Sequence, residues 1–310
     1  MGYKIGSFNM FKYQVYRSDD EIKKDLDKIA NIILSESFDI VALQEIFSEL
    51  AMKNLLSRLG SNWRGCWDRP NSKIAQAAEG YAFIWNTKRI KLAESQTISG
   101  KRTYYPRIYN QYRIDYKKNQ KELVRNPYFA RFNPINTFFE IRLINIHIMF
   151  SGNKDDNTIS LSDSAMRKNE FDILVKSIYG KEADKRYGNN MPAYTIILGD
   201  YNLNLKREWT KGPYVDEIIE ITEGQDVKRV RTIQDQLTTL KQTSNNLGEQ
   251  VRGYANNYDH FSYDENRFAD VTVKSQKIDS VRKYCNDDFE CHRKEVSDHV
   301  PISLNLELHS

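Results

Sequence analysis

The sequence predicts an α/β protein in which helices cover layered β-sheets. Short apolar runs typical of buried strands alternate with amphipathic helical segments over residues 3–59, and further strand-like runs with fewer helices follow. A succession of strand, helix, strand and helix, continued by more strands, is typical of layered α/β domains with one sheet or two sheets packed together. No internal repeat or linker interrupts the 310 residues, so we expect one domain spanning 1–310.

The first elements are defined by apolar spacing. "YKIGSFNM" predicts a strand, and "FDIVALQEI" at 38–46 predicts a strand covered on both faces, because its apolar run is nearly continuous. Between them, Ser18 followed by three acidic residues is a helix start signal, and apolar residues recur at helical spacing as far as Ile33. Residues 48–59 predict a second amphipathic helix.

The rest of the chain carries more strands than helices. A helix is expected at 160–180, and the polar stretch 224–257 predicts an irregular connection, because it has few apolar anchors. The expected strands are 80–90, 128–150 with a hairpin-like break near Asn133, 193–202, 257–263, 268–278 and 300–308.

Composition is that of a soluble globular chain. Hydrophobic residues make up 40% and charged residues 28%, mean hydropathy is −0.68, and no apolar run approaches the roughly 20 residues of a membrane span. The start "MGYKIGSFNM" lacks a signal-peptide pattern, which predicts a cytoplasmic protein, although a processed secreted form would look the same. The net charge of +4 does not by itself indicate nucleic acid.

The three cysteines do not predict a disulfide framework. Cys285, Cys291 and His292 in "CNDDFECH" could begin a metal knuckle, but CxxC spacing and a second half are missing. An ordinary loop or a single loop-closing disulfide is favoured over structural zinc.

Polar side chains follow or interrupt the apolar strands. Gly199 reads as a turn residue, and Asp200 and Asn202 come two apart, so they point the same way if the extended geometry continues. Because loops at strand ends are held by a rigid frame, ligand sites gather there. The polar residues at these positions are Asn9, Glu45, His147, Asp200, Asn202, Asp259, Asp298 and His299.

Each of these residues has an ordinary structural explanation when taken alone. A lone asparagine is a turn former, and a lone histidine in an apolar strand is more often a core residue than a catalyst. Six strand ends that each carry Asn, Asp, Glu or His are an improbable coincidence. Together they supply hard oxygen ligands, which suit Mg²⁺ or Mn²⁺, and histidines that transfer protons near neutral pH. These are the groups that phosphoester hydrolysis needs.

The order of these motifs resembles the endonuclease/exonuclease/phosphatase superfamily. The resemblance rests on "SFNM", "IVALQEI", "INIH", "LGDYN", "NYDHF" and "SDHVPI", which span nearly the whole chain. "LQE", "GDxN" and "SDHxP" are specific as an ordered set and weak individually. The resemblance implies a four-layered α/β sandwich of two central mixed β-sheets flanked by helices. It also implies a Mg²⁺-dependent phosphodiesterase or phosphomonoesterase site, in which Mn²⁺ would substitute.

The resemblance further implies roles for individual residues. Glu45 would be the main metal ligand, helped by Asn9 and Asp298. Asp200 and Asn202 would lie at the scissile phosphate, where they hold or activate water or hydrogen-bond a phosphoryl oxygen.

The two histidines would transfer protons. His299, oriented and charge-tuned by Asp259, would be the general base, and His147 would be the general acid or a phosphate donor, although the sequence leaves open which histidine does which job. "EGYAFIWN" resembles the pancreatic-type deoxyribonuclease branch, in which a glutamate pairs with the first histidine. Glu79 would therefore partner His147.

Other segments resemble the same branch less completely. "VRNPYFARF" resembles its segment with a phosphate-contacting arginine, which would be Arg125, and "NNYDHF" resembles its strand start. His260 stands where that branch usually has arginine, and the branch's cysteine pair is not recognisable. The Trp-x-Asp-Arg signature of inositol polyphosphate phosphatases is absent before Asp259, which counts against that branch.

Residues 101–131 form a basic, tyrosine-rich segment. Nine Lys or Arg face two acidic residues, and six tyrosines are interleaved. Cations offset phosphate charge and tyrosine rings stack on bases, so the segment predicts contact with nucleic acid through Arg107, Arg125 and Tyr128. The ordinary alternative is a solvated loop whose tyrosines cover the sheet edge. A second basic run at 227–231 is expected to be a charged surface.

The combined prediction is a Mg²⁺-dependent phosphodiesterase that hydrolyses DNA. It would be a deoxyribonuclease-like endonuclease that acts as a monomer on double-stranded DNA. The alternative is a phosphatase or sphingomyelinase-type phosphoesterase that uses the same site on a small or lipid phosphoester. A binding module without catalytic activity is a third hypothesis, and the competent residue types at all matched positions argue against it.

Overall fold

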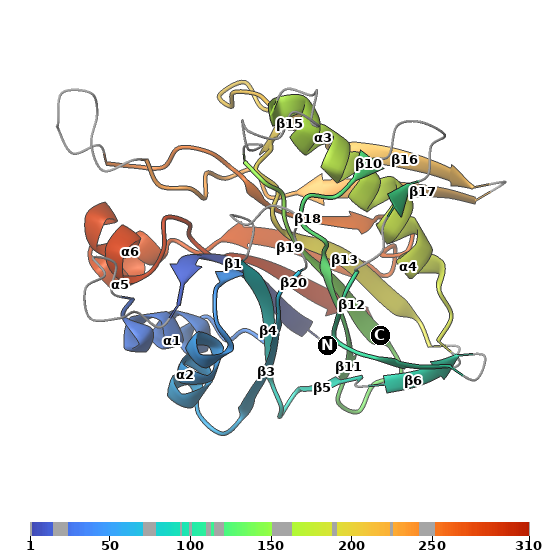
Figure 1. Cartoon of the computed structure of the whole chain (residues 1–310), viewed down its shortest axis with the longest axis horizontal. Coiled ribbons are helices and arrows are strands. Elements are labelled where there is room, and N and C mark those ends of the chain that lie inside the picture. The colour runs from blue at the N-terminus through green and yellow to red at the C-terminus, as the bar shows by residue number, and fades with distance from the viewer. Residues whose placement is uncertain are drawn as a thin grey trace.

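Two β-sheets pack face to face between outer layers of helices (Figure 1). The computed structural model describes residues 2–14, 24–70, 79–93, 95–98, 101–109, 113–114, 121–150, 163–187, 191–223, 226–241 and 252–309. Both sheets contain parallel and antiparallel pairs, so the predicted four-layered sandwich of two mixed sheets is confirmed.

The first sheet has six strands, and its only parallel neighbours among the described residues are the two N-terminal strands. A parallel pair needs a crossover connection, which a helix provides here. The strand order is β19 (Val271–Lys277), β20 (Ile302–Leu308), β1 (Gly2–Tyr13), β2 (Ile40–Ile46), β4 (Gly80–Asn86) and β3 (Trp63–Asp68).

The second sheet has eight strands. Its order is β16 (Ile218–Glu223), β17 (Asp226–Ile233), β18 (Asp259–Asp264), β13 (Ala193–Asp200), β12 (Glu140–His147), β11 (Tyr128–Pro134) and β5 (Ile90–Leu92), with β8 (Arg107–Ile108) also paired to β11. Two-stranded pairs are formed by β6 (Ser95–Ile98) with β7 (Lys101–Tyr104), β9 (Arg113–Ile114) with β10 (Lys121–Glu122), and β14 (Asn204–Leu205) with β15 (Tyr214–Val215).

The helices lie on the outer faces of the two sheets, as Figure 1 shows. On the six-stranded sheet, α1 (Leu26–Ser35), α2 (Glu49–Leu59), α5 (Ser280–Cys285) and α6 (Phe289–Glu295) share an apolar core with its outward side chains. The outer face of the eight-stranded sheet shares a second apolar core with α3 (Asp163–Ile173), a π-helical segment η2 (Leu174–Tyr179) and α4 (Gly180–Asp184). In the described ranges, no helix has the length and apolar character needed to cross a membrane.

Central strands are buried on both faces, which explains their nearly continuous apolar runs. In β12 every residue is buried. Leu143 faces the core between the sheets, where Phe83 and Tyr128 stack with ring centroids 5.2 Å apart, and Ile144 faces the helices. Each fully buried side chain of this size contributes about 1.5–3 kcal/mol, so the two-sided burial fixes the strand register.

The helix expected from Ser18 begins instead at Leu26, so that boundary prediction is wrong. Asp25 is the N-cap, and its side chain accepts a hydrogen bond from the backbone N–H of Lys28 at 2.9 Å. Aspartate satisfies a free helix N–H directly, which acidic residues further upstream do not. Residues 15–23, including Ser18, lie outside the described residues.

The irregular connection expected at 224–257 contains β17, so that prediction is wrong for 226–233. Lys228, Val230 and Thr232 alternate towards the buried face. The sequence does not reveal this alternation, because a lysine is rarely buried and Lys228 is therefore expected to be exposed. In the structure its Nζ lies 2.7 Å from Asp184 Oδ2. Its burial also corrects the expectation that 227–231 is only a charged surface.

Gly199→Ala is expected to destabilise the fold strongly. Gly199 has φ +144°, and a Cβ there would lie 1.9 Å from the carbonyl oxygen of Ile146 on the neighbouring strand. Because backbone rather than a flexible side chain must move, we expect the unfolding free energy to fall by about 3 kcal/mol or more. Urea denaturation measures this loss.

Gly60→Ala is the matched control. Gly60 also has a positive φ, +89°, but none of the described atoms lies within 4 Å of its Cβ position. Only the backbone conformation is then penalised, at about 1–3 kcal/mol, because φ +89° with ψ 180° is almost confined to glycine. Similar losses for the two variants would contradict the steric explanation.

Candidate active site

The polar strand ends meet at one edge of the sandwich, between the two sheets. Strands of both sheets end or bend there, so side chains far apart in the sequence become neighbours. The structure brings together Asn9, Glu45, Glu79 and His299 from the six-stranded side and His147, Asp200, Asn202 and Asp259 from the eight-stranded side. Asp298 precedes His299 in the chain, and its charge acts on that histidine.

The Asp200 carboxylate is the centre of this group. Its Oδ2 accepts a hydrogen bond from Asn9 Nδ2 at 3.0 Å and lies 3.5 Å from both His147 Nε2 and His299 Nε2. The side chain is almost fully buried. Burial raises the pKa of Asp200 to about 6, against the lowering effect of the two histidines.

Asn9 connects the two sheets. Its Nδ2 donates to Glu45 Oε1 and to Asp200 Oδ2, each at 3.0 Å, and its Oδ1 accepts from the backbone N–H of Phe11 at 2.9 Å. The amide N–H groups, not the amide oxygen, thus face the carboxylates, and Asn9 orients both of them. A metal bond from Asn9 would require the amide to turn over, so that role stays a prediction.

Glu45 is presented by a local break in the strand pairing. The register of β1 against β2 shifts between Asn9 and Tyr13, and Phe11, Lys12 and Glu45 have φ of 43°, 53° and 57°. Left-handed backbone costs of order 1 kcal/mol or more at a non-glycine residue and is found at functional sites. The backbone N–H of Lys12 donates to Glu45 Oε2 at 2.9 Å. The break leaves the Glu45 carboxylate oriented and partly exposed.

The chain turns sharply after Asp200. The backbone N–H of Asn202 donates to Asp200 Oδ1 at 2.9 Å, and Asn202 has φ +48°. The condition that extended geometry continues to Asn202 is therefore not met, because the aspartate side chain closes a turn on its own backbone. Asn202 Nδ2 donates to the carbonyl of Ile148 at 2.7 Å and so fixes the loop that follows His147.

His299 is held by Asp259. Its Nδ1 lies 2.8 Å from Asp259 Oδ2, and both side chains are buried. Burial alone would lower the pKa of His299, but the charges of Asp259 and Asp200 and the hydrogen bond to Asp259 together hold that pKa well above its usual value. Its Nε2 remains directed at Asp200.

His147 lies in contact with Glu79, but without the hydrogen-bond geometry that joins His299 to Asp259. Its Nδ1 lies 2.5 Å from Glu79 Oε1, which also lies 2.9 Å from Arg125 Nη1. Burial and the Arg125 charge lower the pKa of His147 to about 4, while burial raises the pKa of Glu79 to about 7. The two histidines therefore differ: His299 favours its charged form and His147 its neutral form.

Oxygen groups at this edge fit a divalent cation. The Glu45 carboxylate is partly exposed, and Oδ1 of Asp298 is buried without a hydrogen-bond partner in the described part of the chain. Asp298 Oδ2 lies 3.5 Å from Arg293 Nη1. Hard oxygen donors suit Mg²⁺ or Mn²⁺, and Mg²⁺ held by one or two carboxylates keeps several waters.

Two further sets of ligand atoms lie within 4.8 Å of one another. They are those of Glu45, Glu79 and His147, and those of Asp200, Asp259 and His299. In both sets the histidine is already oriented by a carboxylate, which suits proton transfer better than a site for a hard cation. Glu45 and Asp298 are therefore the stronger candidates for metal ligands.

The three predicted substrate-binding side chains are engaged within the protein. Besides Glu79, Arg125 Nη1 contacts the carbonyl of His147 at 3.4 Å. Arg107 pairs with a carboxylate of α4 at 3.4 Å, and Tyr128 is buried in the core between the sheets. Only Arg125 lies beside the site, where it supports the histidine pair. The structure does not bring Arg107 or Tyr128 to the site.

The basic segment 101–131 is described only in part. Among its cations, Arg107, Arg125 and Arg131 have described side chains, and each pairs with a carboxylate of the protein. Lys101, Arg102, Arg113, Lys117, Lys118 and Lys121 have side chains outside the described residues. Contact of this segment with nucleic acid therefore stays a prediction.

Several supporting side chains are not identified by the sequence. Gln44 donates to Asn145 Oδ1 at 2.7 Å across the core and links the two sheets. Ser297 Oγ donates to the carbonyl of Asn9 at 2.7 Å. Gln44 and Ser297 belong to the motifs "LQE" and "SDH", so these motifs are a signal by which the two supporting side chains could have been found. Lys24, buried beside the site, lies in a charged stretch that gives no such signal.

The "CNDDFECH" segment contains the last residue of α5, a short connection at 286–288 and the start of α6. The thiols of Cys285 and Cys291 are free, so the disulfide alternative is wrong, and the loop is limited to the connection. Aspartate N-caps begin both helices. His292 Nδ1 lies 2.7 Å from the carbonyl of Ser297, and its Nε2 lies 2.7 Å from Ser280 Oγ. Both ring nitrogens are thus occupied, and His292 supports the segment that carries Ser297.

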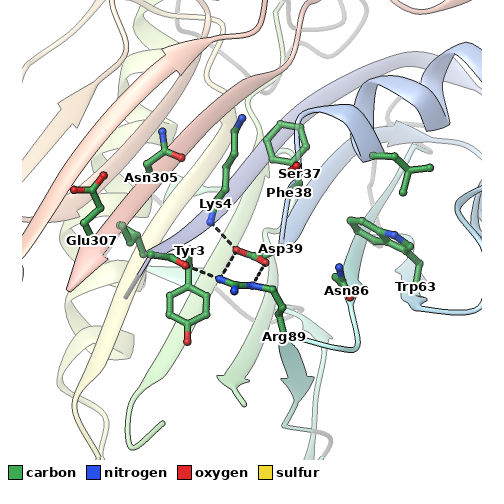
Figure 2. A pocket seen from close by; sticks show the side chains of 13 residues that line it. Tyr3, Lys4, Ser37, Phe38, Asp39, Trp63, Asn86, Arg89, Asn305 and Glu307 are labelled. Carbon is green, nitrogen blue, oxygen red and sulfur yellow. Dashed lines mark hydrogen bonds and ion pairs between the residues drawn. The ribbon is translucent and has the colours of Figure 1, made fainter. Parts of the chain in front are cut away.

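A hollow of about 490 Å³ lies at the other end of β1 from Asn9 (Figure 2). Arg89 Nε donates to Asp39 Oδ1 at 2.6 Å, and Asp39 Oδ2 accepts from the backbone N–H of Lys4 at 2.9 Å. Figure 2 shows these charges directed at each other. Because Arg89 and Asp39 neutralise one another, the strand-end group remains the candidate active site.

Comparison with known proteins identifies the fold. No protein-family model and no curated relative matches the chain. An endonuclease/exonuclease/phosphatase family protein from Bacteroides thetaiotaomicron is similar with a TM-score of 0.52 and 16% identity, covering 99% of this chain and 98% of that chain. A second one, from Bacteroides vulgatus, has a TM-score of 0.55 and 13% identity, covering 100% of both chains. TDP2 from D. rerio, solved with a single-strand DNA product, has a TM-score of 0.52 and 16% identity, covering 99% of both chains.

The chain therefore has the endonuclease/exonuclease/phosphatase fold, as its motifs predict. Identities of 13–16% establish the fold and not the reaction. The likeness to the pancreatic-type deoxyribonuclease branch stays a prediction.

Acidification is expected to destabilise the protein through His292. Burial lowers the pKa of His292 to about 4, whereas an exposed histidine titrates near about 6.5. Between these values the unfolded state binds more protons, so this stabilisation is complete above the higher pKa and is lost as pH falls towards the lower one. Urea denaturation should show that His292→Gln loses about 2 kcal/mol less than the wild type between pH 7 and pH 5.

Glutamine is a suited replacement, because it keeps a donor for Ser297 and an acceptor for Ser280 and does not titrate. An identical pH dependence of the two proteins would show that His292 is not a source of the acid sensitivity.

Proposed function

We propose that this protein is a divalent-metal-dependent phosphodiesterase that hydrolyses DNA. The observation that carries the proposal is the convergence of two histidines, each backed by a carboxylate, on Asp200 Oδ2. Hydrolysis needs a base to activate water and an acid to protonate the leaving oxygen. A phosphodiester bound at Asp200 would have a proton-transfer group on each side.

The reacting atoms of the histidines follow from their partners. Asp259 and Glu79 each contact Nδ1, so Nε2 of His299 and of His147 is the atom that faces Asp200 and exchanges a proton. The sequence resemblance assigns His299 as the general base and His147 as the general acid or phosphate donor. The pKa directions, with His299 favouring its charged form and His147 its neutral form, point to the opposite assignment. We therefore propose the two histidines as the acid and the base and leave open which is which. Asp200 and Asn202 would hold the attacking water or a phosphoryl oxygen.

A Mg²⁺ or Mn²⁺ ion held by Glu45 and Asp298 would neutralise charge on a phosphate oxygen and favour the unprotonated form of the neighbouring His299. Asn9 would orient Glu45 for this task through its hydrogen bond to Oε1. Arg125 would favour the charged form of Glu79 and its contact with His147.

DNA is proposed as the substrate on two grounds. The motif set resembles deoxyribonucleases, and the fold is similar to that of D. rerio TDP2, which was solved with a single-strand DNA product. The basic, tyrosine-rich composition of residues 101–131 supports an anionic polymer as the ligand. Double-stranded DNA is the form we propose first.

Purified protein is expected to nick supercoiled plasmid in Mg²⁺ and to be inactive in EDTA. His147→Ala and His299→Ala should each lower the rate by about 10²–10⁴-fold, because each removes a proton-transfer group. His309→Ala is the matched control, since His309 is exposed beyond β20 and bonds Thr272 instead. Gel electrophoresis of plasmid forms gives the rates.

A substrate panel separates the alternatives. It contains plasmid, linear duplex DNA, single-stranded DNA, single-stranded RNA, sphingomyelin and an inositol phosphate. Turnover of sphingomyelin or inositol phosphate without DNA would place the substrate among lipid or small phosphoesters. No turnover of any of them in Mg²⁺ or Mn²⁺, or full activity of both histidine variants, would contradict the proposed function.

A further inference from the structure

We propose that Lys24 is a substrate-positioning residue whose ammonium group contacts the phosphate of a phosphodiester bound beside Glu45 and Asp298. The assignment rests on the proposed function and specifies how the site holds its substrate. It starts from a buried ammonium group, Lys24 Nζ, that has no hydrogen-bond partner among the described residues. Buried polar groups without partners are rare in folded proteins and call for a ligand or water.

Lys24 is positioned by the start of α1. It precedes the N-cap Asp25, whose backbone N–H donates to the carbonyl of Glu295 at 2.7 Å and ties this point to the end of α6. The side chain is 8% exposed, and Nζ lies 5.2 Å from the centroid of the Phe11 ring. Phe11 belongs to the break that presents Glu45, so the ammonium group lies on the proposed metal-binding side.

The neighbouring charges show what the ammonium group faces. The charges of Asp298 and Glu45 act on Lys24 Nζ, yet neither carboxylate forms an ion pair with it in the described part of the chain. Oδ1 of Asp298 is also buried without a hydrogen-bond partner there. A donor and an acceptor left unsatisfied in the same region indicate that groups from outside the chain lie between them.

The charges around Lys24 indicate that the ligand in contact with its ammonium group is an anion. A divalent cation would match the two negative charges of Glu45 and Asp298. The positive charges of Lys24 and of Arg293, which lies 3.5 Å from Asp298 Oδ2, would then remain without a counterpart. Burial lowers the pKa of Lys24 to about 8, against the raising effect of Asp298 and Glu45. A phosphodiester carries one negative charge and several acceptor oxygens, so it supplies both the charge and the hydrogen bonds that the ammonium group lacks.

The ordinary alternative is that Lys24 only packs on Phe11. A purely structural lysine would stabilise the fold through this contact, and its removal would not depend on the charge of any ligand. Methionine fills a similar space without charge, and replacing a buried charge by an apolar group of similar size is usually tolerated. The two roles can therefore be separated.

The test measures DNA binding by fluorescence anisotropy in the His147→Ala background, which is expected to slow turnover. The probes are one labelled DNA duplex with phosphodiester linkages and the same duplex with uncharged methylphosphonate linkages, in Ca²⁺. Lys24→Met should raise Kd for the phosphodiester probe about tenfold and leave Kd for the methylphosphonate probe unchanged. Lys24→Arg, which keeps the charge, should stay within about threefold of the parent.

Two controls accompany the binding curves. Lys53→Met removes an exposed lysine of α2 that pairs with Glu49, and it should leave both Kd values unchanged. Mn²⁺ affinity, measured by electron paramagnetic resonance, should stay the same or rise in Lys24→Met, because a positive charge near Glu45 is lost. An unchanged Kd for the phosphodiester probe, an equal loss for both probes, or weaker Mn²⁺ binding would overturn the proposal.

Plasmid cleavage by the protein with its native His147 tests the proposed function separately. Protein that binds the phosphodiester probe through Lys24 but cleaves no phosphoester would overturn the function and keep the role of Lys24. If the protein cleaves DNA while the Lys24→Met variant binds DNA normally, the proposed function is kept and the role of Lys24 is overturned.

Discussion

The buried carboxylate of Asp200 is the contact on which the arrangement of the site depends. Asn9 and His299 reach its Oδ2 from the six-stranded side, and His147 reaches it from the eight-stranded side. A buried carboxylate that loses its partners costs several kcal/mol, so these contacts set how the ends of the two sheets meet. The same contacts direct both Nε2 atoms at one point, which links the packing of the sheets to the proposed chemistry.

Each side chain that contacts Asp200 is itself contacted by a further side chain, which restricts its movement. Asp259 and Glu79 fix the two imidazole rings, and Ser297 fixes the backbone of Asn9. The left-handed backbone at Glu45 and Asn202 adds local strain at the same place. Strain that persists at a polar strand end, with the surrounding hydrogen bonds made, is typical of a site preorganised for binding or catalysis.

The sequence is sufficient where a residue's role depends on its own strand. Apolar runs predict the central strands, and the polar residues at their ends correctly indicate that His147, Asp200 and Asp259 are neighbours. The sequence is insufficient where the deciding partner is distant in the chain. Lys228 resembles a surface residue because its partner Asp184 lies on α4, and Lys24 gives no signal because the groups around it come from three other elements. The turn at Asn202 is not predicted because a side chain, not a backbone pattern, closes it.

In the proposed site, oxygen ligands bind a cation, and the two histidines that contact carboxylates transfer protons. Locating the cation tests this assignment directly. Crystals soaked in Mn²⁺ and measured at the manganese absorption edge would show its position by anomalous scattering. We predict one peak within bonding distance of Glu45, on the side of Asp298, and none among Asp200, Asp259 and His299. A peak in that second group, or no bound Mn²⁺ at all, would contradict a metal-dependent phosphoesterase site built in this way.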